Sequence, residues 1–194
     1  MTWLVAGLGN PGERYAATRH NLGYRVVEEL ASRADGRFRK VRFVPVDVCE
    51  RNEAGERLLL AKAHAFMNET GPAFASLARK RDVEPARVIA VHDEIDLPFG
   101  ALRVKFGGST AGHNGVRSVA GAFRTPEFFR VRLGVGRPTG RRDPADWVLE
   151  PFGTREEADV AILVDEGADA VLSIVRDGLA RTQDRYNRAG PRDG

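Results

Sequence analysis

The sequence has little that would cross-link the chain or hold it in a membrane. It contains one cysteine, Cys49, so no internal disulfide can form. No window approaches 18 consecutive apolar residues, and residues 1–6 lack the charged region that begins a signal peptide. We therefore predict a cytoplasmic protein without membrane association, consistent with a reducing compartment.

Motifs of several hydrolase classes are also missing. The chain has no G-x-S-x-G elbow, Cys49 lies in no nucleophile signature, and no histidine lies in an H-E-x-x-H motif. A Ser-His-Asp hydrolase is therefore disfavoured. A metal hydrolase stays open because Asp93, Glu94 and Asp96 are close in sequence, although side chains at the end of a strand alternate in direction. The histidines are His20, His64, His92 and His113.

A glycine-rich segment near the start must be weighed as a nucleotide site. Residues 7–12 match G-x-G-x-x-G and follow a short apolar stretch, a pattern typical of dinucleotide binding. Pro11 and Gly12 disfavour helix continuation, and Thr18 is the better N-cap, so a pyrophosphate would lack the helix N-terminus that normally binds it. No acidic residue ends a second strand about 20 residues further on. We interpret the segment as a tight turn that presents Asn10.

Length and hydrophobic pattern indicate one α/β domain. The 194 residues are 42% hydrophobic and 29% charged, which suits a single globular domain. Strand and helix patterns alternate and one strand pair forms a hairpin, so we expect a mixed twisted sheet surrounded by helices. The catalytic domain should cover residues 1–187, with a flexible tail at 188–194. We predict strands at 3–6, 41–50, 57–61, 88–93, 102–106 and 129–136, and helices at 18–34, 71–81, 116–123, 155–177 and 179–187.

Charge is unevenly distributed along the chain. The formal net charge is only +3, which permits an anionic partner without requiring one. Basic residues concentrate at 37–42, at 130–142 and near the C-terminus, whereas acidic residues cluster at 156–169. For any single arginine, solvated surface charge is the simpler interpretation.

The remaining polar residues suggest chemistry by a base and a water molecule. His20 lies at the opening of a predicted helix, and Asp93 ends a buried strand, where open α/β sheets gather their sites. A carboxylate bonded to one imidazole nitrogen would fix the tautomer and stabilise the imidazolium that forms when the other nitrogen takes a proton. Asn68 and Asn114 lie at helix starts and could donate to an oxyanion.

Several sequence blocks follow one another in a fixed order. They are residues 7–12 with Tyr15, 18–21 with Gly23, 66–68 with Gly71, 92–98 with Gly100, 107–108 with 112–115, 130–138 and 148–149. These blocks make the chain resemble bacterial peptidyl-tRNA hydrolase. They run from near the N-terminus to about residue 152, and the helical tail also fits in outline. The lysine-proline start that is frequent before residues 66–68 in this family is replaced here by residues 62–65, Lys-Ala-His-Ala.

The resemblance implies a monomeric enzyme that needs neither metal nor cofactor. It would hydrolyse the ester between a peptide, or an N-blocked amino acid, and the 3′-terminal ribose of tRNA, which recycles tRNA for translation. The matching motifs make His20 the base that activates water and Asp93 the group that keeps it basic.

The same resemblance assigns the substrate contacts. Asn10 matches the residue that separates blocked from free aminoacyl ends. Asn68 and Asn114 match groups that bind the peptide and the 3′ end. Three further residues match the walls of the cleft, and two basic residues lie where the family contacts the acceptor stem of tRNA. The wall residues are Tyr15, Phe66 and Met67, and the basic residues are Lys105 and Arg132.

An alternative from another class is a non-catalytic RNA-binding module on the same fold. Such a protein would keep the basic surface after losing hydrolysis. Retention of His20, Asp93 and the three asparagines in one chain favours the enzyme.

Overall fold

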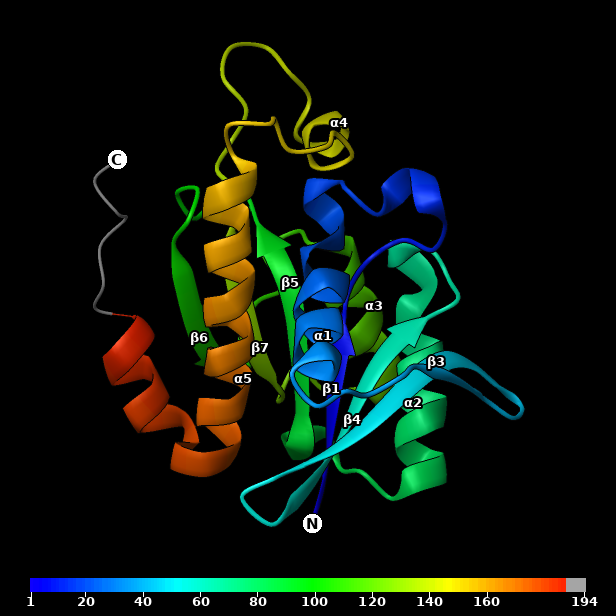
Figure 1. Cartoon of the computed structure of the whole chain (residues 1–194). Coiled ribbons are helices and arrows are strands. Elements are labelled where there is room, and N and C mark those ends of the chain that lie inside the picture. Colours follow the sequence, from blue (N-terminus) through cyan, green and yellow to red (C-terminus); the bar gives the residue numbers. More distant parts are fainter. Residues whose placement is uncertain (188–194) are drawn as a thin grey trace.

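A seven-stranded mixed sheet forms the centre of the protein, as a computed structural model of residues 1–187 shows (Figure 1). The flexible tail predicted at 188–194 lies outside the described residues. The strands are β1 (Thr2–Gly7), β2 (Arg39–Val41), β3 (Val44–Glu53), β4 (Glu56–Ala63), β5 (Val88–Glu94), β6 (Leu102–Phe106) and β7 (Phe129–Gly134). The α-helices are α1 (Leu22–Ser32), α2 (Thr70–Arg81), α3 (Asn114–Phe123), α4 (Pro144–Val148) and α5 (Glu157–Tyr186).

The strands follow the order β2-β3-β4-β1-β5-β7-β6. β4, β1, β5 and β7 run parallel, whereas β2, β3 and β6 are antiparallel to their neighbours. This confirms the expected mixed α/β sheet and the predicted hairpin, which is formed by β3 and β4. The carboxyl ends of the four parallel strands share one edge, so the segments that follow them lie close together.

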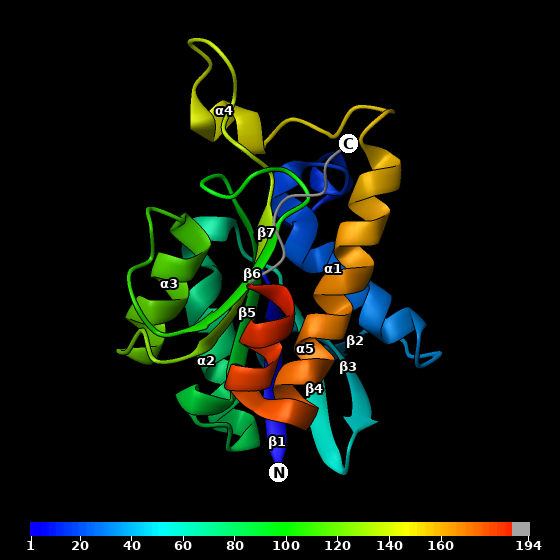
Figure 2. The same ribbon diagram turned by 90° about the vertical axis from the view of Figure 1, so that its left-hand side faces the viewer.

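Helices cover both faces of the sheet, as the side view makes clear (Figure 2). Trp3 and Val5 of β1 pack into the apolar cluster shared with α1 and α5, whereas Leu4 and Ala6 pack into the cluster shared with α2 and α3. A strand buried on both faces is expected to be apolar throughout rather than alternating. The short apolar run at the start of the sequence has this cause.

Gly23 lets the start of α1 lie directly on the strands. A Cβ at this position would come within 2.2 Å of the Val91 carbonyl oxygen and 2.4 Å of the Leu8 nitrogen, which no side chain can tolerate. Helix α1 therefore begins at the carboxyl edge of β1 and β5. The 3-10 turn Arg19–Asn21, which immediately precedes α1, is brought to the same edge.

Some predicted boundaries were wrong for identifiable reasons. Thr18 occupies the N-cap position of the 3-10 turn Arg19–Asn21 and not of α1, which begins only at Leu22; its hydroxyl donates to the Tyr15 carbonyl at 2.8 Å and caps no backbone amide. The strand predicted at 41–50 is divided by a turn at residues 42–43, where Phe43 has a φ of 64°. The predicted break at Gly178 is confirmed, because Gly178 has a φ of 78° and divides α5 into two helical parts. The five-residue α4 was not predicted.

None of the helices formed by residues 1–187 combines the length and the apolar character that a membrane crossing needs.

The contact between α2 and α3 gives a test of this packing. A Cβ on Gly71 of α2 would lie 2.0 Å from the Ser118 carbonyl oxygen of α3, whereas a Cβ on Gly121 would meet nothing within 4 Å. We expect Gly71→Ala to lower the free energy of unfolding by about 1–3 kcal/mol through overpacking. Gly121→Ala should raise it by about 0.5–1 kcal/mol, because alanine is the better helix former. Urea unfolding of both variants measures these free energies, and equal stabilities would contradict the close contact between α2 and α3.

Candidate active site

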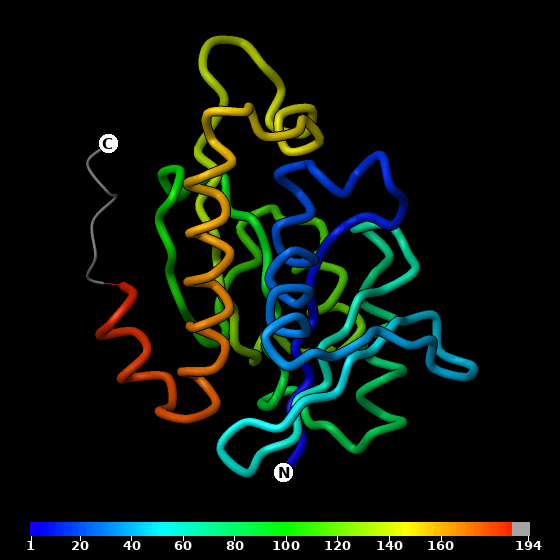
Figure 3. Tube along the Cα trace, viewed as in Figure 1, coloured from blue at the N-terminus to red at the C-terminus, as the bar shows by residue number. Residues whose placement is uncertain are grey.

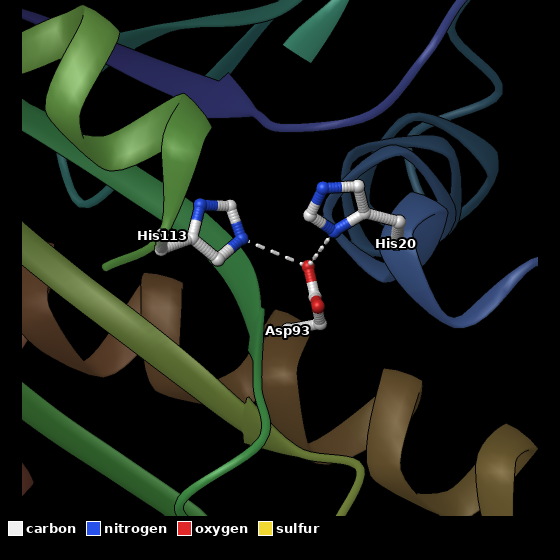
Figure 4. Close-up of side chains that lie close together, drawn as sticks. All are labelled: His20, Asp93 and His113. Atoms are coloured by element: carbon white, nitrogen blue, oxygen red, sulfur yellow. Dashed lines mark hydrogen bonds and ion pairs between the residues drawn. The ribbon is translucent and has the colours of Figure 1, made fainter. Parts of the chain in front are cut away.

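Three side chains from distant parts of the chain meet at one carboxylate oxygen (Figure 4). Asp93, at the carboxyl end of β5, is 1% exposed. Its Oδ1 lies 2.9 Å from Nδ1 of His20 and 2.9 Å from Nε2 of His113. His20 belongs to the turn before α1, and His113 directly precedes α3. The predicted pairing of His20 with Asp93 is therefore present, together with a second imidazole that the sequence analysis did not assign.

The position of His113 at the start of α3 determines its tautomer. Its Nδ1 accepts hydrogen bonds from the backbone nitrogens of Gly115 and Val116, at 3.1 and 3.3 Å. These amides have no partner within the helix, so the imidazole acts as an N-cap. Because Nδ1 accepts, Nε2 must carry the proton, and it donates this proton to Asp93.

His20 is held in the complementary tautomer. Its Nδ1 donates to Asp93, so Nε2 carries the free lone pair, and Nε2 accepts no hydrogen bond from residues 1–187. Burial lowers the pKa of His20, but the charge of Asp93 and the hydrogen bond to it outweigh burial and raise the pKa above its ordinary value. The result is an imidazole that is a stronger base than one in water.

The carboxylate that supports both rings stays ionised although it is buried. Burial raises the pKa of Asp93, but His20 and His113 together hold it well below its usual range. Beneath them lies His92, which is 2% exposed and packs edge-on to His113 with ring centroids 4.6 Å apart. Burial and the neighbouring His113 lower the pKa of His92, so it fills this position as a neutral ring.

A cavity of about 220 Å³ opens beside these groups. It adjoins His20, Asp93 and Asn114, which the sequence analysis placed in the site, and also the turn after β5 and the start of α4. The residues that were not predicted are Glu94, Ile95, Ala111, Gly112, His113, Pro144, Ala145 and Val148. Three of these residues were missed because they belong to helix α4, which the sequence analysis did not predict.

A second polar group binds three loops together around Asn10, which lines a separate cavity of about 280 Å³ with Asn21. Asn21 accepts from the Asn10 backbone nitrogen and donates to the Asn10 carbonyl, both at 2.9 Å. The Asn10 side-chain oxygen accepts from the Met67 nitrogen at 2.8 Å. Asn10 is 6% exposed, so it is buried rather than presented by a turn as the sequence suggested. No hydrogen bond within residues 1–187 uses its Nδ2.

Gly115 lies between the Asp93 site and the contacts around Asn10, because it adjoins both His113 and Met67. A Cβ there would lie 2.4 Å from the Met67 sulfur and 3.2 Å from Cε1 of His113. Met67 is 4% exposed and so lies against the first turn of α3. The loop that carries Met67 and Asn68 therefore borders the start of α3, although neither residue lines the cavity.

The other predicted substrate residues differ in exposure. Phe66 is 48% exposed and its ring meets that of Tyr15 edge-on, with centroids 6.2 Å apart. Asn68 and Asn114 are exposed, and the Asn114 side-chain oxygen accepts from Arg117. This leaves the Asn114 Nδ2 as a donor.

Arg19 fixes the turn that carries His20. Its guanidinium is 3% exposed and donates to the Pro151 carbonyl at 2.7 Å and to Glu156 at 3.0 Å. It also lies 3.6 Å from the centre of the Trp147 ring. The segment between α4 and α5 is thereby attached to the residue adjacent to the base, and this contact was not foreseen.

Lys105 and Arg132, the predicted tRNA contacts, lie on β6 and β7 and do not line the cavity, although Arg132 contacts the lining residue Glu94. Arg132 binds Glu94 through Nε and Nη2, at 3.2 and 3.0 Å. Lys105 donates to the Ser109 carbonyl at 3.3 Å. Partial burial and the charges of Arg130 and Arg132 lower the pKa of Lys105.

In the hydrogen-bonded arrangement described above, the imidazoles at Asp93 offer a metal ion no free lone pair beside Oδ1. Ligand atoms of His20, Asp93 and His113 lie within 4.8 Å of one another, a spacing that a cation could bridge. Each imidazole nitrogen that faces Oδ1, however, carries the proton it donates and has no lone pair for a metal. If the proton of His113 moved to Nδ1, that nitrogen could no longer accept from the backbone N–H groups of Gly115 and Val116, and the N–H groups would face one another.

Glu94 and Asp96, which left a metal hydrolase possible in the sequence analysis, do not form a metal site with Asp93. Glu94 is bound by Arg132, and Asp96 forms an exposed ion pair with Arg137. Within residues 1–187 they join no cluster of metal-ligating side chains.

Comparison with known proteins agrees with the expected resemblance. The family model described as peptidyl-tRNA hydrolase matches residues 4–193. Peptidyl-tRNA hydrolase of Arthrobacter sp. (strain FB24) is 47% identical, over 97% of this chain and 97% of that protein. The corresponding protein of Frankia alni is 48% identical, over 95% of this chain and 93% of that protein. The crystal structure of peptidyl-tRNA hydrolase from Acinetobacter baumannii superposes with a TM-score of 0.88 at 29% identity, covering 98% and 96% of the two chains.

A match over nearly the whole chain, in sequence and in fold, confirms the resemblance and does not favour the non-catalytic alternative. The chain belongs to the peptidyl-tRNA hydrolase family, whose members are enzymes that hydrolyse the ester bond between a peptide and tRNA.

Proposed function

We propose that His20 is the general base of this hydrolase and that Asp93 and His113 keep it in the active tautomer. The observation that carries the proposal is the shared Oδ1 of Asp93, which accepts from both rings and leaves His20 Nε2 with its lone pair. The opposite nitrogen of His113 is occupied by the start of α3, so of the two rings bound to Asp93 only His20 has a free basic nitrogen. General base catalysis of this kind contributes about 10²–10⁴-fold to the rate.

The reaction follows from this assignment. A water oxygen attacks the ester carbonyl carbon while its proton passes to Nε2 of His20, and the negative charge of Asp93 stabilises the imidazolium that forms. The tetrahedral intermediate carries its negative charge on the former carbonyl oxygen, where amide N–H donors stabilise it. The bond from the carbonyl carbon to the ribose 3′ oxygen then breaks. The proton on His20 passes to that oxygen, which releases tRNA and the peptide acid.

We propose that the three asparagines contact the substrate in different ways. Asn114 adjoins the cavity and has a free Nδ2, which suits donation to a carbonyl or an oxyanion. Asn68 is exposed next to Met67 and can donate to the peptide backbone. Asn10 can offer only Nδ2, because its oxygen is bound to the Met67 nitrogen. That fixed orientation makes Asn10 a donor toward an acyl group, which suits recognition of a blocked end.

The aromatic pair provides a surface for the terminal nucleotide. Tyr15 and the half-exposed Phe66 meet edge-on, and an unpaired base can stack on such a ring. Lys105 and Arg132 remain our predicted contacts to the acceptor stem. Arg132 keeps Nη1 free of Glu94, so it can still bind a phosphate.

We further propose that the enzyme acts as a monomer in the cytoplasm, within one domain that spans residues 1–187. The catalytic groups come from a single chain, since the two rings and the carboxylate all lie in this domain. Hydrolysis needs no metal in this mechanism, because water is activated by an imidazole.

Substitution of the base tests the proposal directly. We expect His20→Ala to lower kcat/KM for N-blocked aminoacyl-tRNA by about 10²–10⁴-fold, because no other group can take the proton from water. Release of tRNA is measured with blocked and with free aminoacyl-tRNA, in the presence of a strong chelator. His64→Ala is the control, because this half-exposed histidine pairs with Asp47 outside the cavity.

Wild type and His64→Ala should cleave only the blocked substrate, and His20→Ala should still bind tRNA. Activity of His20→Ala near the wild-type level would refute the role of the base. Loss of wild-type activity in the chelator would refute metal-free hydrolysis.

The charge of Asp93 should be visible in the pH dependence. Neutral His20 is the active form, so kcat/KM should rise with pH through a pKa that Asp93 holds above the ordinary value. Asp93→Asn keeps an oxygen acceptor but removes the charge. We expect it to lower kcat/KM by on the order of 10²-fold and to move the acidic limb of the profile to lower pH.

The matched control for this experiment is Asp96→Asn, which removes a nearby exposed carboxylate. Its pH profile should follow that of wild type, and circular dichroism should be unchanged in both variants. An acidic limb that stays in place in Asp93→Asn would mean that Asp93 does not set the basicity of His20.

A further inference from the structure

A large groove at the β2 edge of the sheet is lined mainly by basic side chains. Its volume is about 890 Å³, against about 220 Å³ for the cavity beside His20. The hairpin of β2 and β3, which forms one wall, stands out from the body of the protein in the tube view (Figure 3). The basic lining residues are Arg37, Arg39, Lys40, Arg42, Lys80 and Arg81, and the acidic ones are Asp35 and Glu50.

Most of these cations are not neutralised by the protein. Within residues 1–187, Arg81 alone of the six forms an ion pair, at 3.4 Å from Glu50, and that carboxylate also binds Arg57. Arg39, Lys40 and Arg42 are exposed, and none of them has a carboxylate partner among the described residues. Lys80 donates to the Arg42 carbonyl at 2.6 Å, which attaches the end of α2 to the hairpin turn. Clustered like charges repel one another, and a bound anion would relieve this repulsion.

An exposed aromatic ring stands beside the charges. Phe43 is 85% exposed, more than any other large hydrophobic side chain in residues 1–187. Its φ of 64° is a left-handed conformation that is uncommon for a bulky residue. The guanidinium of Arg42 lies 4.6 Å from the centre of the ring. Phe43 thus contributes nothing to the core and keeps its ring in solvent.

Protection of the sheet edge does not account for this combination. Charged side chains on an edge strand discourage pairing with other chains, and β2 is such a strand. An exposed phenylalanine has the opposite effect, because it favours association. Exposed cations beside an exposed aromatic ring are instead an arrangement that binds single-stranded nucleic acid, where cations contact phosphates and bases stack on the ring.

We propose that this groove binds a segment of single-stranded RNA, with phosphates at Arg39, Lys40 and Arg42 and one base stacked on Phe43. The site is separate from the catalytic centre, because β2 lies four strand spacings from β5, or about 19 Å at roughly 4.8 Å per spacing. It also lies at the opposite end of the sheet from Lys105 on β6. Binding of an acidic protein would need only the positive charges. The exposed aromatic ring favours a partner whose bases can stack on it.

The test uses the full chain and a fluorescent oligouridine of about 12 nucleotides, within the usual site sizes for single strands. Anisotropy is measured between about 50 and 200 mM salt. Arg39→Gln/Lys40→Gln should weaken binding and reduce the slope of log affinity against log salt by about 1.4, because two phosphate contacts are lost. Phe43→Ala should weaken binding about 5- to 150-fold, as expected for one stacked base, and leave the slope unchanged.

The matched control is Arg181→Gln/Arg185→Gln, which removes two exposed charges from α5 and should leave binding as in wild type. An equal loss in this control would show attraction by net charge only and would overturn the proposal. An unchanged affinity of Phe43→Ala for the oligouridine would also overturn the proposal. Binding of the protein to phosphatidylserine vesicles without binding to the oligouridine would overturn it as well.

Two further measurements identify the source of the RNA and separate this site from catalysis. Competition by unacylated tRNA would assign the groove to single-stranded parts of tRNA, and failure to compete would assign it to another RNA; both results support the site. Arg39→Gln/Lys40→Gln should hydrolyse a short N-blocked aminoacyl ester at the wild-type rate. The result for the groove is therefore independent of whether His20 is the base.

Discussion

The site depends on one oxygen atom that accepts two hydrogen bonds. Oδ1 of Asp93 lies 2.9 Å from each of two imidazole nitrogens, and the buried carboxylate stays ionised because of them. A charge removed from water costs several kcal/mol unless hydrogen bonds compensate it. Both rings must therefore remain in place for the carboxylate to be tolerated. The same bonds determine which nitrogen of each ring is protonated, so stability of the buried charge and basicity of His20 have a common origin.

The fold supplies these groups from the backbone upward. Gly23 removes the side chain that would separate α1 from β1 and β5, so the turn with His20 reaches the end of β5. The first amides of α3 bind His113 and orient it toward the same carboxylate. Arg19 attaches the turn to the segment before α5, and Asn21 attaches it to Asn10. The groups are thus held by contacts between loops and element ends, which preorganises them before any substrate binds.

The sequence predicted the parts of this arrangement that have a local signal. Alternation and apolar runs indicated the strands, and the order of motifs indicated His20 and Asp93. His113 was not assigned, because a histidine before Asn114 has no pattern that distinguishes an N-cap from a surface residue. Asn10 was expected at a lip but is buried, since its partner Met67 lies 57 residues away in the chain. Helix α4 was not found because five residues with a proline at the start are too few for a helical period. Contacts over such distances are set by tertiary packing, which no local pattern encodes.

The distribution of charge over the sheet extends the same reasoning. At the centre, two imidazoles donate hydrogen bonds to the ionised Asp93, and near it Glu94 is paired with Arg132, so the carboxylates of the catalytic edge have partners. At the β2 edge the opposite holds, because Arg39, Lys40 and Arg42 have no ion-pair partner within residues 1–187 and an aromatic ring remains in solvent. A domain with a net charge of only +3 has no general need for such a cluster. The contrast indicates that the protein separates two tasks in space: proton transfer where the charges are buried and hydrogen-bonded, and attraction of a polyanion where they are exposed.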